Sequence, residues 1–173
     1  LKSRSYAQAA GESVGPLSHC LRAVELHEES YKGTRRLVVD MLAQAGLQAV
    51  EAESIADEWL IHGDFLLAGV SQRFDFVVGN PPYVRQELIP APLLTEYRRR
   101  FTTLYDRADL YVPFIERSLG LLADEGQLCF ICSDRWMKNK YGGPLRELVS
   151  RHFQLRLHID MVNADAFHSE VSA

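Results

Sequence analysis

Residues 74–83 read Phe-Asp-Phe-Val-Val-Gly-Asn-Pro-Pro-Tyr, an apolar run that stops at two consecutive prolines. The run is short and rich in β-branched and aromatic residues, which is typical of a strand buried on both faces of a parallel sheet. Pro81 and Pro82 fix φ and lack an N–H donor, so the strand cannot continue through them. A stiff loop therefore follows the carboxyl end of this strand, where open α/β sheets bind their ligands.

The loop carries groups suited to holding a flat aromatic amine. We interpret the Asn80 side-chain oxygen and the Pro81 carbonyl as acceptors for the two N–H bonds of such an amine, which would aim its lone pair at an electrophile. Tyr83 would stack on the base, a contact worth roughly 1–3 kcal/mol. An amine inside a duplex is out of reach, so its nucleotide would have to be flipped out. Taken alone, the four-residue motif is also compatible with a structural turn and a packed tyrosine.

The segment that begins at Asp64-Phe65-Leu66 and ends at Asn80-Pro81-Pro82-Tyr83-Val84-Arg85 resembles the N6-adenine DNA methyltransferases of restriction–modification systems, in particular the gamma type. The resemblance extends from about residue 22 to the end of the chain. It implies an α/β fold with a Rossmann-like sheet flanked by helices, and S-adenosylmethionine as the cofactor. It also implies that residues 80–83 are the catalytic loop.

The same resemblance assigns cofactor contacts to residues upstream of the loop. Asp64 would accept a hydrogen bond from the adenine amine of S-adenosylmethionine, with Phe65 beside that ring; a capping aspartate and a core phenylalanine are the plain alternatives. Glu25, near the end of the apolar segment 20–26, is suited to hydrogen-bond both hydroxyls of a ribose. Glu28 and Glu29 are better explained as acids in the first turn of a helix.

Downstream of the loop, Arg85, Arg135 and Lys138 are candidates for contacts to the DNA backbone. Residues 133–143 form a polar loop in which cations alternate with aromatic side chains, a composition that suits nucleic acid; an ordinary exposed loop explains it equally well. The basic run 98–100 is better explained as a solvated helix face. By resemblance, Phe167 would stack on the flipped base opposite Tyr83, whereas a phenylalanine before a polar turn is commonly part of a core.

The predicted elements alternate between strand and helix, which predicts a mainly parallel sheet. Their order is strand 20–26, helix 28–46, strand 59–67, strand 74–78, helix 109–123, strand 127–132, helix 144–153 and strand 155–161. No glycine-rich cofactor motif is recognisable in residues 1–19. We therefore expect an irregular segment over 1–19 and a partial methyltransferase catalytic domain over 20–173. Its sheet would be incomplete, with the central strand and the target recognition domain supplied by other residues.

Composition limits the other possibilities. The chain has 173 residues, of which 47% are hydrophobic, enough for one sizeable core. The formal net charge of -4 argues against a broadly basic surface, although cations can still gather at one rim. No apolar run approaches the ~20 residues of a membrane span, so we expect a cytoplasmic protein without a membrane partner. Cys129 and Cys132 lie three apart on a predicted strand and point to opposite faces, so we expect no metal site.

Three functions stay open. The first is methyl transfer from S-adenosylmethionine to the N6 amine of a flipped adenine in double-stranded DNA, in a restriction–modification or related defence system with a fused or separate endonuclease and recognition domain. The second is methyl transfer to a protein glutamine or an RNA base. The third is a non-catalytic DNA-binding remnant. Arg85, the segment Asp109-Leu110-Tyr111 and the context of Phe167 favour DNA.

Overall fold

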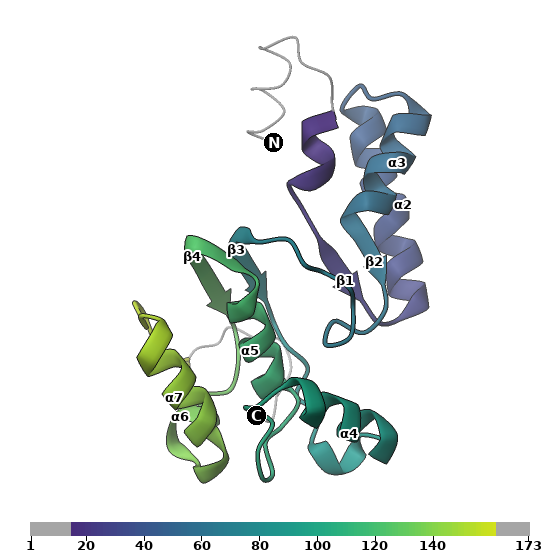
Figure 1. Cartoon of the computed structure of the whole chain (residues 1–173). Helices are drawn as coiled ribbons and strands as arrows, with labels where there is room; N and C mark the ends of the chain where they lie inside the picture. Colours follow the sequence, from purple (N-terminus) through teal and green to yellow (C-terminus); the bar gives the residue numbers. More distant parts are fainter. Residues whose placement is uncertain (1–14, 162–173) are drawn as a thin grey trace. The chain divides into compact units, whose positions relative to one another are not determined.

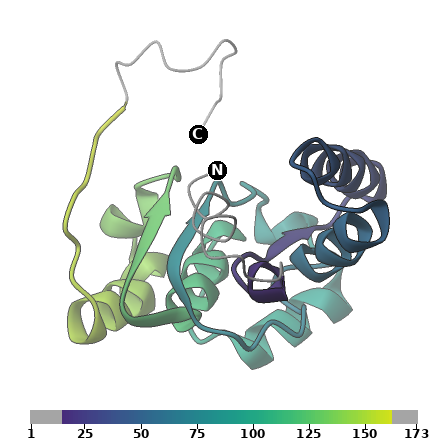
Figure 2. The same ribbon diagram turned by 90° about the horizontal axis from the view of Figure 1, so that it is seen from above.

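The structure is a computed structural model that describes residues 15–161. The chain divides into two compact units, residues 1–70 and 71–173, each with its own buried side chains (Figures 1 and 2). This division differs from the predicted one, into a segment 1–19 and a catalytic domain 20–173, which stays a prediction. None of the helices between residues 15 and 161 has the length and apolar character needed to cross a membrane.

The first unit packs two helices against a short pair of parallel strands. β1 (Ala23–Glu25) lies parallel to β2 (Leu60–His62), with the last residues of the two strands opposite each other. η1 (Gly15–His19) precedes β1, and α2 (Glu28–Gln44) and α3 (Ala49–Trp59) connect the strands. Figure 1 shows α2 and α3 side by side, and both contact β2. The predicted strands and first helix are present, with shorter bounds.

No helix is predicted between residues 47 and 58, yet α3 forms there. A capping box starts it: the Gln48 side chain accepts from the backbone of Glu51, and the Glu51 side chain accepts from the backbone N–H of Gln48. Ala52, Ile55 and Ala56 are buried at helical spacing. Because two of these three are alanines, the apolar stripe is weak in the sequence although it is sufficient for packing.

The second unit is built on a longer parallel pair. β3 (Phe74–Gly79) pairs with β4 (Leu122–Phe130), with an irregularity in register near the start of β3. Between the strands lie η2 (Gln86–Leu88), α4 (Ala91–Arg100) and α5 (Tyr111–Gly120). α6 (Arg135–Lys138), η3 (Lys140–Gly142) and α7 (Gly143–His152) follow β4. α5 packs against β4 and α7 and supplies much of the core of this unit.

The predicted single sheet is not what residues 15–161 form. Their four strands make two separate two-stranded parallel sheets, β1–β2 and β3–β4. The structure is therefore a mixed α/β fragment with short parallel sheets, and a full Rossmann-like sheet is not seen. The strand predicted for 155–161 is also wrong: this segment alternates apolar and polar residues, but it is exposed and has no strand partner among the described residues. Alternation alone cannot make a strand without a neighbouring edge to pair with.

The prediction that the strand 74–78 is buried on both faces is wrong for the described part of the chain. Phe76 is 70% exposed and Val78 is 76% exposed. Cys129 and Ile131, on the β4 side of the same sheet, are also exposed. The physical reason is that the helices described in this unit cover only one face of the sheet, whereas the apolar run is suited to cover on both.

The loop between α6 and α7 tests the packing of the second unit. A side chain at Gly142 would overlap the Trp136 carbonyl, which also accepts a hydrogen bond from Arg146 at 2.6 Å. We expect Gly142→Ala to lower the free energy of unfolding by about 1–3 kcal/mol in urea unfolding of the protein, because the methyl group must displace backbone.

Gly143→Ala is the matched control. Gly143 is the first residue of α7, and a methyl group there would lie 3.9 Å from the nearest neighbouring atom, Arg146 Nη2. Removing a helical glycine is expected to leave stability unchanged or to raise it by about 0.5–1 kcal/mol. Equal effects of the two substitutions would contradict the packing described for this loop.

Candidate active site

The loop after β3 is tied to neighbouring elements on both sides. At the ends of the strands the Ile131 N–H donates to the Gly79 carbonyl at 3.1 Å, and the Tyr83 hydroxyl donates to the Ile131 carbonyl at 3.1 Å. Just after the loop, the Leu110 N–H donates to the Val84 carbonyl at 2.8 Å. The residues between these anchors therefore have little freedom to move, and the prolines stiffen them further.

Within this loop the polar and aromatic side chains are accessible. Asn80 and Pro82 are exposed, Pro81 is buried, and Tyr83 is 41% exposed. The Asn80 carboxamide forms no hydrogen bond with any side chain or backbone group in residues 15–161. It is thus available to a ligand. The buried ring of Pro81 fixes the backbone beside it.

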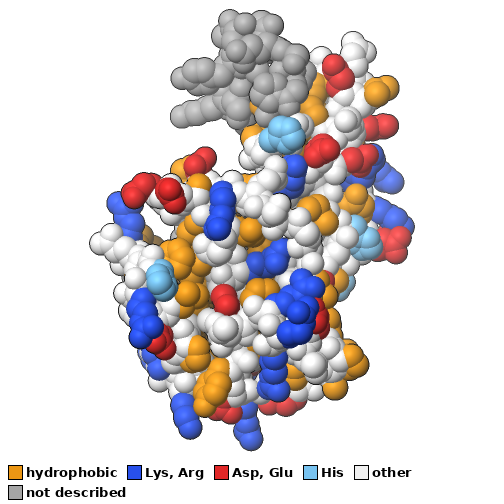
Figure 3. Space-filling view, in the orientation of Figure 1, with side chains coloured by type: hydrophobic (Ala, Val, Ile, Leu, Met, Phe, Trp, Pro, Cys, Tyr) orange, Lys and Arg blue, Asp and Glu red, His pale blue; other side chains and the backbone are white. Residues whose placement is uncertain are grey.

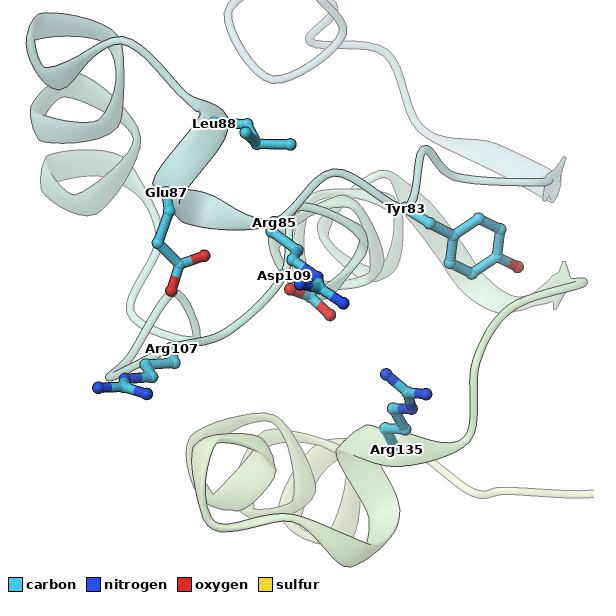
Figure 4. A pocket seen from close by; sticks show the side chains of 7 residues that line it. All are labelled: Tyr83, Arg85, Glu87, Leu88, Arg107, Asp109 and Arg135. Atoms are coloured by element: carbon cyan, nitrogen blue, oxygen red, sulfur yellow. The ribbon is translucent and has the colours of Figure 1, made fainter. Parts of the chain in front are cut away.

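Tyr83 lines a cleft of about 630 Å³ in the second unit. The lining is mostly charged: Tyr83, Arg85, Glu87, Leu88, Arg107, Asp109 and Arg135. In Figure 4 Tyr83 lies at one end of the cleft, Glu87 and Arg107 lie at the other end, and Arg85 and Asp109 lie between them. An aromatic ring beside guanidinium groups is an arrangement that suits a nucleotide.

A row of tyrosines supports the Tyr83 ring from behind. Tyr83 and Tyr111 have ring centroids 6.1 Å apart and tilted by 44°. The hydroxyls of Tyr111 and Tyr141 are hydrogen-bonded at 3.1 Å. Burial raises the pKa of Tyr111, and the hydrogen bond to Tyr141 raises it further. Burial also raises the pKa of Tyr83, so both phenols are held in the neutral form.

The carboxylate in the cleft is influenced by charges of both signs. Burial raises the pKa of Asp109 above its ordinary value. The positive charges of Arg135 and Arg85 lower this pKa, and the negative charge of Glu87 raises it slightly. Asp109 is therefore close enough to both arginines to interact with them electrostatically.

Of the three residues predicted to contact the DNA backbone, two line the cleft. Arg85 and Arg135 line the cleft, whereas Lys138 is not among its lining residues and pairs with Asp134 at 2.6 Å. The loop around them is not uniformly exposed, because Trp136 is only 7% exposed. The expectation of a polar loop that presents two aromatic side chains is thus wrong for Trp136, whose ring packs into the unit.

Two of the three arginines at the end of α4 pair with an acid of the same helix. Glu96 pairs with Arg99 at 2.7 Å and with Arg100 at 2.6 Å, and these hydrogen bonds lower the pKa of Glu96 to about 2. Arg98 donates to the Gln86 side chain at 2.8 Å. All three arginines are exposed, which agrees with the expected solvated helix face.

In the first unit, Glu25 and Asp64 lie at the same edge of the strand pair. Glu25 ends β1, and Asp64 follows β2 by two residues. The Glu25 carboxylate accepts from the His27 N–H at 2.8 Å, and the Asp64 carboxylate accepts from the Leu66 N–H at 2.8 Å. A carboxylate has about four acceptor positions, and both side chains stand at strand ends, where open α/β sheets bind ligands. This donor set fits the ribose and adenine groups of a nucleoside. Phe65, next in sequence, is partly buried.

Two neighbouring acids have a simpler role. Glu28 and Glu29 stand in the first turn of α2 and both pair with Lys32, at 2.8 and 3.4 Å. They agree with the expectation of acids at a helix start. Phe167 lies outside the described residues. Within residues 15–161, no three metal-binding side chains come together.

The sequence is similar to known DNA-modification enzymes. Residues 20–167 match the Eco57I restriction-modification methylase family. The chain belongs to this family. It is 58% identical over 167 residues to the Type II methyltransferase M.PaeR7I of Pseudomonas aeruginosa, covering 96% of this chain and 29% of that protein. The predicted resemblance to methyltransferases of restriction–modification systems is thereby confirmed.

Two further relatives define the extent of the match. The chain is 53% identical over 171 residues to the Type II methyltransferase M.XhoI of Xanthomonas vasicola, covering 97% of this chain and 31% of the relative. It is 34% identical over 104 residues to the Type II restriction enzyme and methyltransferase RM.Eco57I of Escherichia coli, and this match covers 58% of this chain and 10% of that protein. The chain of this family member thus spans less than a third of the curated relatives it matches most fully.

Several residues of the cleft in this Eco57I-family chain were not singled out from the sequence. Glu87, Leu88 and Arg107 carry no spacing signal, because Glu87 and Leu88 lie in the three-residue helix η2 and Arg107 lies in the irregular segment after α4. Asp109 was predicted only as part of the segment Asp109-Leu110-Tyr111, which the resemblance relates to a DNA substrate; α5 begins two residues after it. Their convergence is a product of tertiary packing.

The buried tyrosine pair generates a pH-dependent prediction. Because the folded-state pKa of Tyr111 is raised, its neutral hydroxyl stabilises the fold fully below pH ~10, and this stabilisation is lost as pH rises further. We expect Tyr111→Phe to be less stable than the wild type at pH 8. The difference in free energy of unfolding should narrow between pH 10 and 11 in urea titrations.

Tyr105→Phe is the control, since Tyr105 is half exposed. Its stability relative to the wild type should change little over the same range. A gap between wild type and Tyr111→Phe that widens with pH would contradict the burial of this hydroxyl.

Proposed function

We propose that this chain is the catalytic segment of a methyltransferase that uses S-adenosylmethionine to methylate the N6 amine of a flipped adenine in DNA, within a restriction–modification system. One observation carries the proposal: an Asn-Pro-Pro-Tyr loop is anchored at the carboxyl end of β3, with Asn80 exposed and Tyr83 lining a cleft. Membership of the Eco57I restriction-modification methylase family supports the same reaction class.

In this proposal the loop activates and positions the amine. The Asn80 side-chain oxygen and the Pro81 carbonyl each accept one N–H of the amine, so that the nitrogen becomes pyramidal and its lone pair is directed outward. The same two oxygens would stabilise the positive charge that develops on the nitrogen as its bond to the methyl carbon forms and the bond from that carbon to sulfur breaks, leaving its electron pair on sulfur. The Tyr83 ring stacks on the base and keeps it in register. The extra proton on the nitrogen then leaves to solvent.

The residues at the carboxyl edge of β1 and β2 suit the cofactor. S-adenosylmethionine, when bound, supplies a methyl group made electrophilic by the positive sulfur. Glu25 accepts hydrogen bonds from the ribose hydroxyls, and Asp64 accepts from the adenine amine. Phe65 lies next to Asp64 and packs against the adenine ring. The position of both carboxylates at the same edge of the β1–β2 pair supports these assignments.

DNA is the substrate that the charges of the cleft favour. Arg85 and Arg135 line it beside Tyr83, which suits a base with a phosphate attached. Figure 3 shows Lys and Arg side chains interspersed with Asp and Glu, so the visible face has no broad basic area. Contact to the backbone is then local. A separate recognition domain and an endonuclease, fused or separate, complete the proposed system, and Phe167 remains a predicted stacking residue.

Replacing the amide of the loop tests the mechanism. We expect Asn80→Ala to lower the rate of methyl transfer from labelled S-adenosylmethionine to duplex DNA by at least about 100-fold in the full-length protein, since one of the acceptors that positions the amine is lost. DNA binding should stay within about threefold of the wild type.

The control is Gln44→Ala, which deletes an exposed carboxamide from the last residue of α2. It should transfer methyl groups at the wild-type rate. Undiminished turnover by Asn80→Ala would exclude the mechanism. Methyl transfer to RNA or to a protein glutamine, with none to DNA, would show that the substrate is not DNA. Binding of DNA without methyl transfer would indicate a non-catalytic remnant.

A binding experiment tests the cofactor residues. We expect Glu25→Gln and Asp64→Asn each to weaken binding of S-adenosylhomocysteine by about tenfold or more in calorimetry, because a charge-assisted hydrogen bond becomes a neutral one. Each amide keeps an oxygen for the backbone N–H that the acid now accepts from. Glu28→Gln, at the start of α2, is the matched control and should bind normally; equal losses in all three variants would refute the assignment.

A further inference from the structure

The cleft beside Tyr83 brings together two arginines from segments far apart in the sequence. Arg85 immediately precedes η2, after the loop that follows β3, and Arg135 begins α6, after β4. Figure 4 shows the Arg135 side chain pointing across the cleft toward Arg85 and Asp109, with Tyr83 at one end. Folding of the second unit, rather than local spacing, creates this pair of cations.

The charges near Tyr83 leave an excess of positive charge. Both arginines act on the Asp109 carboxyl, as the direction of their effects on its pKa shows. The lining near Tyr83 holds two guanidinium groups and one carboxylate, while Glu87 and Arg107 lie at the far end (Figure 4). A lining with more guanidinium groups than carboxylates suits a phosphodiester anion.

Arg85 differs from most cations of this unit. Arg99 and Arg100 are held by Glu96, and Lys138 is held by Asp134. By contrast, Arg85 has neither an ion pair nor a side-chain hydrogen bond to any residue between 15 and 161. An exposed arginine is commonly just solvated, but this one converges with a second arginine next to an accessible aromatic ring.

We propose that Arg85 and Arg135 form a subsite for one phosphate of the target DNA strand, the phosphate adjacent to the flipped nucleotide. Guanidinium groups bind phosphate oxygens through paired, charge-assisted hydrogen bonds. A base stacked on Tyr83 remains joined to its backbone, so a neighbouring phosphate has to pass close to this ring. Asp109 lies between them in the cleft and interacts with both electrostatically. The inference rests on the proposed function, because it takes a DNA strand as the ligand.

The salt dependence of DNA binding tests a shared phosphate. Each neutralised phosphate contributes about 0.9 to the slope of log affinity against log salt concentration. With the full-length protein and a short duplex of random sequence, Arg85→Ala and Arg135→Ala should each lower the slope by up to about 1. The double variant should also lower it by about 1, since both side chains serve the same phosphate. Arg99→Ala, an exposed arginine paired on α4, is the control and should keep the wild-type slope.

A slope lowered by about 2 in the double variant, or left unchanged, would overturn the shared subsite. A second measurement locates the phosphate. On a duplex that the wild-type protein methylates, a neutral methylphosphonate next to the target adenine should weaken wild-type binding about tenfold and leave binding by the double variant unchanged. An equal loss in both proteins would place the phosphate elsewhere and refute the inference.

Two outcomes separate this inference from the proposed function. Methyl transfer to adenine by the wild type, combined with an unchanged slope in the variants, removes the subsite and leaves the function. A lowered slope without any methyl transfer by the wild type retains the subsite and removes the function. Affinity for S-adenosylhomocysteine should be the same in wild type and variants; a loss would assign the arginines to the cofactor carboxylate instead.

Discussion

The candidate site depends on where the pairing of β3 and β4 ends. The last hydrogen bond joins the Ile131 N–H to the Gly79 carbonyl, two residues before the first proline. Pro81 and Pro82 have no N–H to offer, so the ladder has to stop and the chain has to leave the sheet at this point. Gly79 allows the close approach, because a side chain there would lie 3.1 Å from the Phe130 ring. The position of the loop is therefore a consequence of two residue types at the end of one strand.

The features that could be predicted from the sequence have strong local signals. β3, α5 and the positions of Glu25 and Asp64 at strand ends follow from apolar runs and from the residues that interrupt them. Other features depend on contacts that no local pattern encodes. α3 is held by small buried residues whose stripe is faint, and Trp136 is buried although the sequence around it is basic and polar.

The residues at the end of the cleft far from Tyr83 show why part of the site could not be predicted from the sequence. Arg107, at this end, lies in the connection between α4 and α5. One carboxylate helps to set the path of this connection: Glu116 accepts hydrogen bonds from the backbone and hydroxyl groups of Thr102 and Thr103, at 2.6–3.2 Å. The other end of the connection is held by the Leu110 N–H on the Val84 carbonyl. These partners are 13 to 26 residues apart. Spacing along the chain therefore says little about which side chains face the loop after β3.

Charge pairing explains how a chain with a net charge of -4 can present a cationic site. Several arginines and lysines elsewhere in the described residues pair with acids: Arg22 with Glu58, Arg35 with Asp57, and Lys138 with Asp134. Such pairs contribute little field at a distance, since the opposite charges lie side by side and exposed pairs are screened by salt. An arginine without such a partner, set beside a second arginine in a cleft, therefore dominates the local potential even though the whole chain is acidic. The distribution of carboxylates, more than the number of cations, decides where a phosphate is attracted.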